Sequence, residues 1–112
     1  MRYALALLAS LALPAQAAPD AGFPVVDVDA FCLKASPREP VGRASCVRQE
    51  QIDYEYAKTL WVDLSPKGRA YCAEMMRTAS GAEYRLLASC VQGTLGNERN
   101  ERDRVVTPRF RP

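Results

Sequence analysis

The chain is short, almost balanced in charge and free of histidine. Its 112 residues include 15 Lys and Arg against 13 Asp and Glu, so the formal net charge is +2, and four cysteines are present. This balance predicts no nucleic-acid partner, and the length predicts one domain. Without histidine, a serine or cysteine hydrolase that uses imidazole as its base is excluded.

Residues 1–17 have the features of a secretory signal peptide. Arg2 precedes an apolar run rich in alanine and leucine, and the small-residue sequence Ala-Gln-Ala ends at Ala17. The run is about 11 residues long, whereas a bilayer span needs roughly 20. We therefore predict cleavage after Ala17 and a mature protein that is periplasmic or secreted and does not span the membrane.

The first half of the mature chain predicts a lead-in and two helices. Residues 18–26 are interrupted by proline and glycine, which predicts a flexible segment. A short helix is expected to begin at Asp27 or Asp29, whose carboxylates suit an N-cap, and to end near Ser36. The longest helix is expected over residues 41–63, because apolar side chains recur there on one face.

Two more helices are predicted in the second half. Ser65 followed by proline is a helix start signal, and this third helix is expected to end at Gly81. A fourth helix is expected over residues 82–92 and to be closed by the glycines Gly93 and Gly96. No stretch alternates polar and apolar residues with period two, so the fold class is all-α.

The C-terminal residues 96–112 predict an Arg-rich mobile tail beyond a helical domain that covers residues 27–95. Arginine alternates with acidic residues along the tail, which could make weak contact with anionic lipid. Phe110 lies between two arginines and is a candidate partner contact.

The cysteines lie in a repeat. Ala-Ser-Cys-Val occurs at 44–47 and 88–91, and each copy follows a lone cysteine. In an exported chain an even number of cysteines predicts disulfides, which for loops of this length stabilise by roughly 3 kcal/mol each. Three pairings are possible and loop entropy does not separate them, but the repeat favours Cys32–Cys46 with Cys72–Cys90. These spacings lack Cys-x-x-Cys and close ligand pairs, so we predict no metal and no cofactor.

The segment that follows Cys46 carries an extended motif. The run CVRQEQIDYEYAKTLW places polar and aromatic residues at fixed offsets from this cysteine, namely Glu50, Gln51, Tyr54, Lys58 and Trp61. It resembles small exported cysteine-containing all-helical proteins common in alphaproteobacteria, with the motif Cys-[Ile/Val]-x-x-Glu-Gln-x-x-Tyr-x-x-x-Lys-x-x-Trp. The resemblance covers about Cys32–Val91 and implies a compact helical fold with disulfides, without an established activity. Ala57 replaces the usual leucine, and the second repeat lacks the Glu-Gln-x-x-Tyr continuation.

Two carboxylates fall on the apolar face of the longest predicted helix. Glu50 and Asp53 could form an acid/base pair in a groove, as in glycoside hydrolysis. Alternatively, Glu50 is a structural buried polar residue that is hydrogen-bonded or paired with an arginine such as Arg69 or Arg77. We favour the structural interpretation, because a chain this small has few walls to enclose a sugar, and we predict no enzyme.

The remaining candidates are apolar and aromatic. Tyr54, Trp61 and Met75 are expected to pack in the core or to line a ligand groove between helices. Ile52 and Tyr56 lie one turn apart on the outward face and are candidate partner contacts. The sequence thus predicts a non-catalytic exported module that binds another envelope protein or serves in an envelope assembly. The alternative is a small-ligand-binding periplasmic protein.

Overall fold

A computed structural model describes residues 22–106 and residue 110, and the predicted signal peptide lies outside these residues. Four helices follow one another along the chain, and no strand occurs within the described part. The all-α prediction is therefore confirmed. The helices are α1 (Val28–Ala35), α2 (Pro40–Trp61), α3 (Pro66–Thr78) and α4 (Tyr84–Val106).

The starts of α1 and α3 are set by side-chain caps that the sequence predicted. The Asp27 carboxylate accepts a hydrogen bond from the backbone N–H of Ala30 at 3.0 Å. The Ser65 hydroxyl accepts one from the N–H of Gly68, also at 3.0 Å, and a proline occupies the first helical position after it. Each cap satisfies an N–H that has no partner within its own helix.

The predicted end of the fourth helix is wrong. Instead of closing at Gly93 or Gly96, α4 continues to Val106. A glycine in a helix interior costs about 1 kcal/mol but stops the helix only where the backbone turns left-handed. Here Leu95, between the two glycines, is buried, and Glu98 beyond them bonds to Ser65. These two contacts hold the backbone helical through both glycines.

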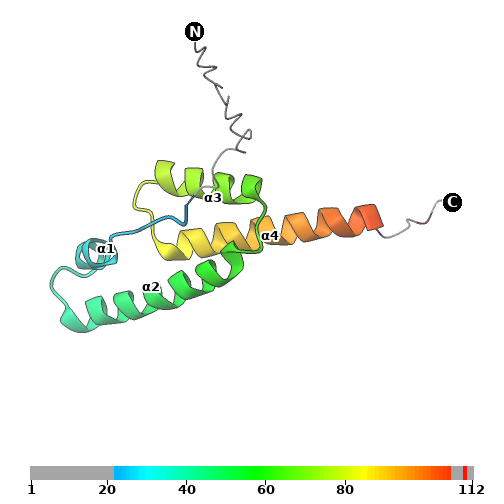
Figure 1. The fold of residues 1–112 in the computed structure, drawn as a ribbon. Coiled ribbons are helices and arrows are strands. Elements are labelled where there is room, and N and C mark those ends of the chain that lie inside the picture. The colour runs from blue at the N-terminus through cyan, green and yellow to red at the C-terminus, as the bar shows by residue number, and fades with distance from the viewer. Residues whose placement is uncertain (1–21, 107–109, 111–112) are drawn as a thin grey trace, which may run out of the picture.

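The helices form two hairpins that pack through their long members. α2 lies along α4, α1 packs on α2, and α3 packs on α4 (Figure 1). The disulfide Cys32–Cys46 joins α1 to α2, and Cys72–Cys90 joins α3 to α4, with Cα separations of 5.6 and 5.8 Å. The predicted pairing and the two related units are therefore confirmed, each unit being a short helix fastened to a longer one.

The hydrophobic core lies between α2, α3 and α4. Tyr84, Leu87 and Val91 on α4 are its centre, and Leu87 and Val91 are completely buried. α2 and the turn after it add Ala57, Trp61 and Leu64, and α3 adds Cys72 and Met76. α1 remains outside this cluster, with Cys32 as its one buried residue.

Residues 22–27, which we call the N-terminal strap, are ordered against the bundle. The strap is non-helical, as predicted, but the predicted flexibility is wrong for these residues, because its Phe23 packs against aromatic rings of α2 and α4. The Tyr84 hydroxyl accepts a hydrogen bond from the Val26 N–H at 3.0 Å and donates one to the Pro24 carbonyl at 3.4 Å. Figure 1 shows the strap crossing from α1 towards α3. The first helix of the fold thus begins on a fixed segment.

Candidate functional site

A cleft of about 290 Å³ opens where the strap, α1, α2 and the start of α4 meet. The strap, the first turn of α1, the middle of α2 and Tyr84 line it. We call it the Glu50 cleft, after the buried carboxylate that lines it. The lining residues are Val26, Val28, Asp29, Val47, Glu50, Gln51, Tyr54 and Tyr84.

Glu50 is the buried polar residue of the cleft, with 3% of its surface exposed. Its Oε2 accepts a hydrogen bond from the backbone N–H of Tyr84 at 2.8 Å, and Tyr84 is the first residue of α4. Glu50 therefore caps α4 from a neighbouring helix, where a carboxylate also meets the positive end of the helix dipole.

The pKa of Glu50 lies above the ordinary glutamate value. Burial of the carboxylate is the main cause, and the negative charges of Glu83 and Asp53 act in the same direction. The backbone N–H groups of Tyr84 and Arg85 oppose this shift, because they stabilise the ionised form. The cleft thus holds a carboxylate whose negative charge is only partly compensated by its surroundings.

Glu50 is buried, and its partners are the backbone N–H groups of Tyr84 and Arg85. Arg77, one of the arginines considered as a partner, instead bonds to Glu74 on its own helix. Asp53 lines a different cavity of about 320 Å³ with Gln49 and Arg85. Glu50 and Asp53 therefore line two different cavities.

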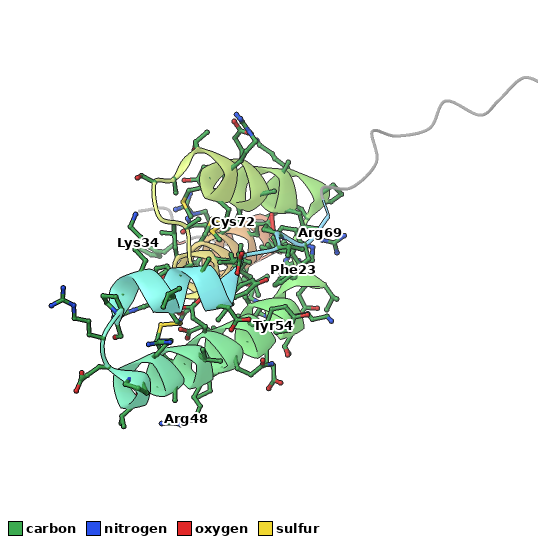
Figure 2. The ribbon with its side chains drawn as sticks, turned by 90° about the vertical axis from the view of Figure 1, so that its left-hand side faces the viewer. Phe23, Lys34, Arg48, Tyr54, Arg69 and Cys72 are labelled. Atoms are coloured by element: carbon green, nitrogen blue, oxygen red, sulfur yellow. A yellow bond between two sulfur atoms is a disulfide. The ribbon has the colours of Figure 1, made fainter. Side chains whose placement is uncertain are left out.

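The three residues predicted to line a ligand groove belong to the hydrophobic core or pack against it. The ring of Phe23 packs edge-on against Tyr54 and Trp61, with centroids 5.6 and 5.3 Å apart. Figure 2 shows Phe23 beside Tyr54. Trp61 is buried in the core, and Met75 packs against that core. Of the three, Tyr54 also reaches a cleft, as a wall of the Glu50 cleft.

The predicted partner contacts on α2 are exposed. Ile52 and Tyr56 have 59% and 44% of their surfaces accessible. Both lie on the side of α2 away from the face that carries the Glu50 cleft. Phe110, at the C-terminal end, is 90% exposed. All three candidates are therefore accessible, on two separate parts of the molecule.

The part of α4 beyond the core, residues 96–106, is a second prominent feature, which we call the α4 extension. It projects away from the other helices (Figure 1). At its base, Glu98 accepts hydrogen bonds from the backbone N–H of Ser65, at 2.9 Å, and from the Ser65 hydroxyl. Residues 99–105 are all exposed, including Val105 at 82%. A hollow of about 510 Å³ lies along one side, lined by Ser65, Glu98, Glu101, Arg102 and Val105.

Charges along the α4 extension largely cancel. Over residues 98–104, three arginines alternate with three carboxylates. Arg104 pairs with Glu101 at 3.4 Å, and Arg99 approaches Asp63 at 3.9 Å. Anionic lipid would therefore meet little net positive charge on this helix. The last arginines of the predicted tail lie outside the described residues.

Sequence reasoning missed three residues that shape these sites. Phe23 lies in a segment rich in proline and glycine, and its sequence signal is a large aromatic residue just before the first helix. Tyr84 lies within the predicted fourth helix, but its capping by Glu50 and its bonds to the strap join segments distant in sequence. Glu98 was assigned to the tail, although it anchors α4 to the start of α3.

Comparison with known proteins identifies no relative of this chain. No family model matches the chain, and no curated protein or solved structure is significantly similar to it. No group of His, Cys, Asp and Glu that could hold a metal ion occurs among the described residues. None of the helices described here is both long and apolar enough to cross a membrane. The two disulfides are typical of a protein that folds in an oxidising compartment.

Proposed function

We propose that this protein is a non-catalytic, exported interaction module of the cell envelope, in the periplasm or secreted, and that the α4 extension binds another envelope protein. The observation that carries the proposal is the run of exposed helix after Leu95, the last core residue of α4. A helix of this length gains little stability by itself in water, and most helical stability comes from packing of one face. Here packing ends at Glu98, while the helix continues to Val106.

The hollow beside the extension supports a helical or extended partner segment at this place. Its lining residues Glu98, Arg102 and Val105 are spaced three or four positions apart, so they share one face of α4. This face combines an apolar side chain with charges of both signs, as the rim and core of a protein interface do. Phe110 lies four residues after Val106 in the sequence and is also exposed.

Site-specific photo-crosslinking in the source cells tests the proposal. A photoreactive amino acid in place of Val105 should give one discrete adduct with a second protein. The matched control is Val41, which is also exposed, at 78%, but lies in the first turn of α2. Equal labelling from both positions, or no adduct from Val105, would contradict a specific contact at the extension.

Truncation after Glu98 separates binding from folding. The shortened chain keeps Leu95 and the bonds between Glu98 and Ser65, so its melting temperature should stay within about 2 °C of the full chain, since exposed residues contribute little. Its crosslinks and its partner should be lost. The same reagent at Ile52 and Tyr56 tests whether the outward face of α2 contacts the same partner.

A specific observation also favours the second candidate function, a small-ligand-binding protein of the periplasm. It is the Glu50 cleft, which combines a buried carboxylate with aromatic and aliphatic walls. The ligand site then lies beside Tyr54 and Glu50, away from Trp61 and Met75, which belong to the packed interior.

A further inference from the structure

We infer that the Glu50 cleft is a binding site for a small organic cation, a primary ammonium carried on an apolar body. This inference is independent of the proposed contact at the α4 extension, which lies at the other end of α4. It rests on the composition of the cleft, the burial of one carboxylate and the shape of the walls.

The charge of the cleft has one sign. Glu50 and Asp29 are its only Asp or Glu, and the residues that line it include no lysine and no arginine. Glu50 is almost completely buried, whereas Asp29 is exposed in the first turn of α1. A buried carboxylate without a cationic partner is costly, because neither water nor an opposite charge compensates it fully. An ammonium group in the cleft would supply that charge.

Existing contacts of Glu50 leave room for this role. Its Oε2 accepts from the Tyr84 N–H at 2.8 Å, and the backbone N–H of Arg85 also bonds to this carboxylate, so Glu50 is fixed at the start of α4. A carboxylate has about four lone-pair positions on two oxygens, so a fixed carboxylate can still accept from a ligand. One turn along α2 from Tyr54, Lys58 donates from its Nζ to the Tyr54 hydroxyl at 3.3 Å and lies over the Tyr54 ring. Lys58 is not part of the cleft lining.

The walls suit an apolar body rather than a bare ion. Tyr54 and Tyr84 meet edge to face, with ring centroids 5.0 Å apart. Three valines, from the strap, α1 and α2, complete the lining, namely Val26, Val28 and Val47. Aromatic faces also attract an ammonium group. A cavity of about 150 Å³ holds benzene, so 290 Å³ accommodates an aryl-alkyl ammonium of modest size.

Three probes of one shape test the inference on the native chain. Phenethylammonium, phenethyl alcohol and hydrocinnamate share a phenyl body but are cationic, neutral and anionic. Binding is followed by NMR as shifts of the backbone amides of Glu50, Tyr54 and Tyr84. We expect the ammonium to bind at least about tenfold more tightly than the alcohol, and the carboxylate not to bind. Equal binding of ammonium and alcohol, or no shift with any probe, would overturn the inference.

Two variants test whether the preference for the ammonium probe depends on the charge of Glu50. Glu50→Gln keeps an oxygen for the Tyr84 N–H but removes the charge, so ammonium binding should fall at least about tenfold while alcohol binding persists. Glu101→Gln makes the same change on the α4 extension and should leave binding unaltered. If Glu50→Gln does not fold, Asp29→Asn at the rim should lower ammonium affinity about threefold, since an exposed charge is screened. Unchanged ammonium affinity in both folded variants would refute the site.

Discussion

The two disulfide-linked units have the same construction but different surroundings. In the α3/α4 unit, Cys72 and Cys90 are both buried and belong to the hydrophobic core. In the α1/α2 unit, Cys32 is buried, Cys46 is half-buried, and neither belongs to that core. The same tetrapeptide therefore carries one disulfide inside the core and one at its edge. We conclude that the repeat determines which cysteines pair, while tertiary packing determines what each bond stabilises.

The largest expected effect separates these two disulfides. Replacing Cys72 and Cys90 together by alanine should lower the free energy of unfolding by about 3–5 kcal/mol, because loop-closure entropy and core packing are lost together. Replacing Cys32 and Cys46 together should cost about 2 kcal/mol or less. α1 packs mainly on α2 and reaches the hydrophobic core through Val28, so it can detach while the core stays folded, which limits the loss.

Chemical denaturation measures the loss of unfolding free energy in each double variant, and amide hydrogen exchange measures whether α1 detaches. In the Cys32/Cys46 double variant, the amides of α1 should exchange quickly while those of Leu87 and Val91 remain protected. A loss of protection at Leu87 in that variant would show that the two units unfold as one, and would contradict the comparison. Non-reducing mass spectrometry first confirms that the remaining disulfide is formed.

The strap contacts both units, and the next largest effect concerns its Phe23. Phe23→Ala removes a ring that contacts Tyr54 and Trp61 of α2 and stacks near Tyr84 of α4. We expect a loss of about 2 kcal/mol, less than for a fully buried phenylalanine, because Phe23 is half-buried. Trp61 is the single tryptophan, so its fluorescence should shift to the red as water reaches it. Phe23→Leu is the control and should recover part of the stability.

Glu50 and Glu98 provide a third comparison, because each caps the start of a neighbouring helix but their pKa values shift in opposite directions. Burial raises the pKa of Glu50. At Glu98, the effect of burial is outweighed by hydrogen bonds from the Ser65 hydroxyl and N–H and by the charge of Arg102, so its pKa is lowered. Folding thus shifts the titration of Glu50 to higher pH and that of Glu98 to lower pH.

The pH dependence of stability should follow these signs. The contribution from the lowered pKa of Glu98 is present above the ordinary glutamate pKa and is lost as the pH falls through its folded value. The contribution from protonated Glu50 is present at low pH and is lost as the pH rises through its raised value. The stability difference between wild type and Glu98→Gln should therefore grow with pH, to about 1 kcal/mol at neutrality. The stability difference between wild type and Glu50→Gln should instead shrink as the pH rises.

Melting curves of the three proteins from mildly acidic to neutral pH provide the measurement. Each variant keeps one oxygen acceptor but replaces the other oxygen by an amide nitrogen, so the sign of the pH slope is compared and not the size of the stability difference. Parallel pH profiles for Glu50→Gln and Glu98→Gln would contradict the assignment of opposite shifts. Glu55→Gln, an exposed change on α2, is the control for altered surface charge.

Local patterns allowed much of this fold to be predicted. The carboxylate of Asp27 and the Ser65-Pro66 pair mark helix starts by contacts within four residues, and both were found. The disulfide pairing followed from the repeat. The position of Phe23, the bond from Tyr84 to Glu50 and the bond from Ser65 to Glu98 join residues far apart in the chain. No periodicity encodes such contacts, so the Glu50 cleft and the length of α4 required the structure.

The smallest expected effects come from replacing glycines by alanine on the two sides of the α3/α4 contact. Alanine at Gly93 or Gly96 should raise stability by about 0.5–1 kcal/mol each, because a β-carbon there meets nothing within 4 Å and alanine favours a helix. At Gly68, a β-carbon would lie 3.2 Å from both carboxylate oxygens of Glu98 and from Cγ2 of Thr94. Gly68→Ala should therefore lower stability by roughly 1 kcal/mol, since α4 must move from α3 or Glu98 must release Ser65. Urea denaturation of the three variants checks the opposite signs. A stabilised Gly68→Ala would show that Glu98 moves away easily, and that the helical backbone past Gly96 does not depend on this anchor.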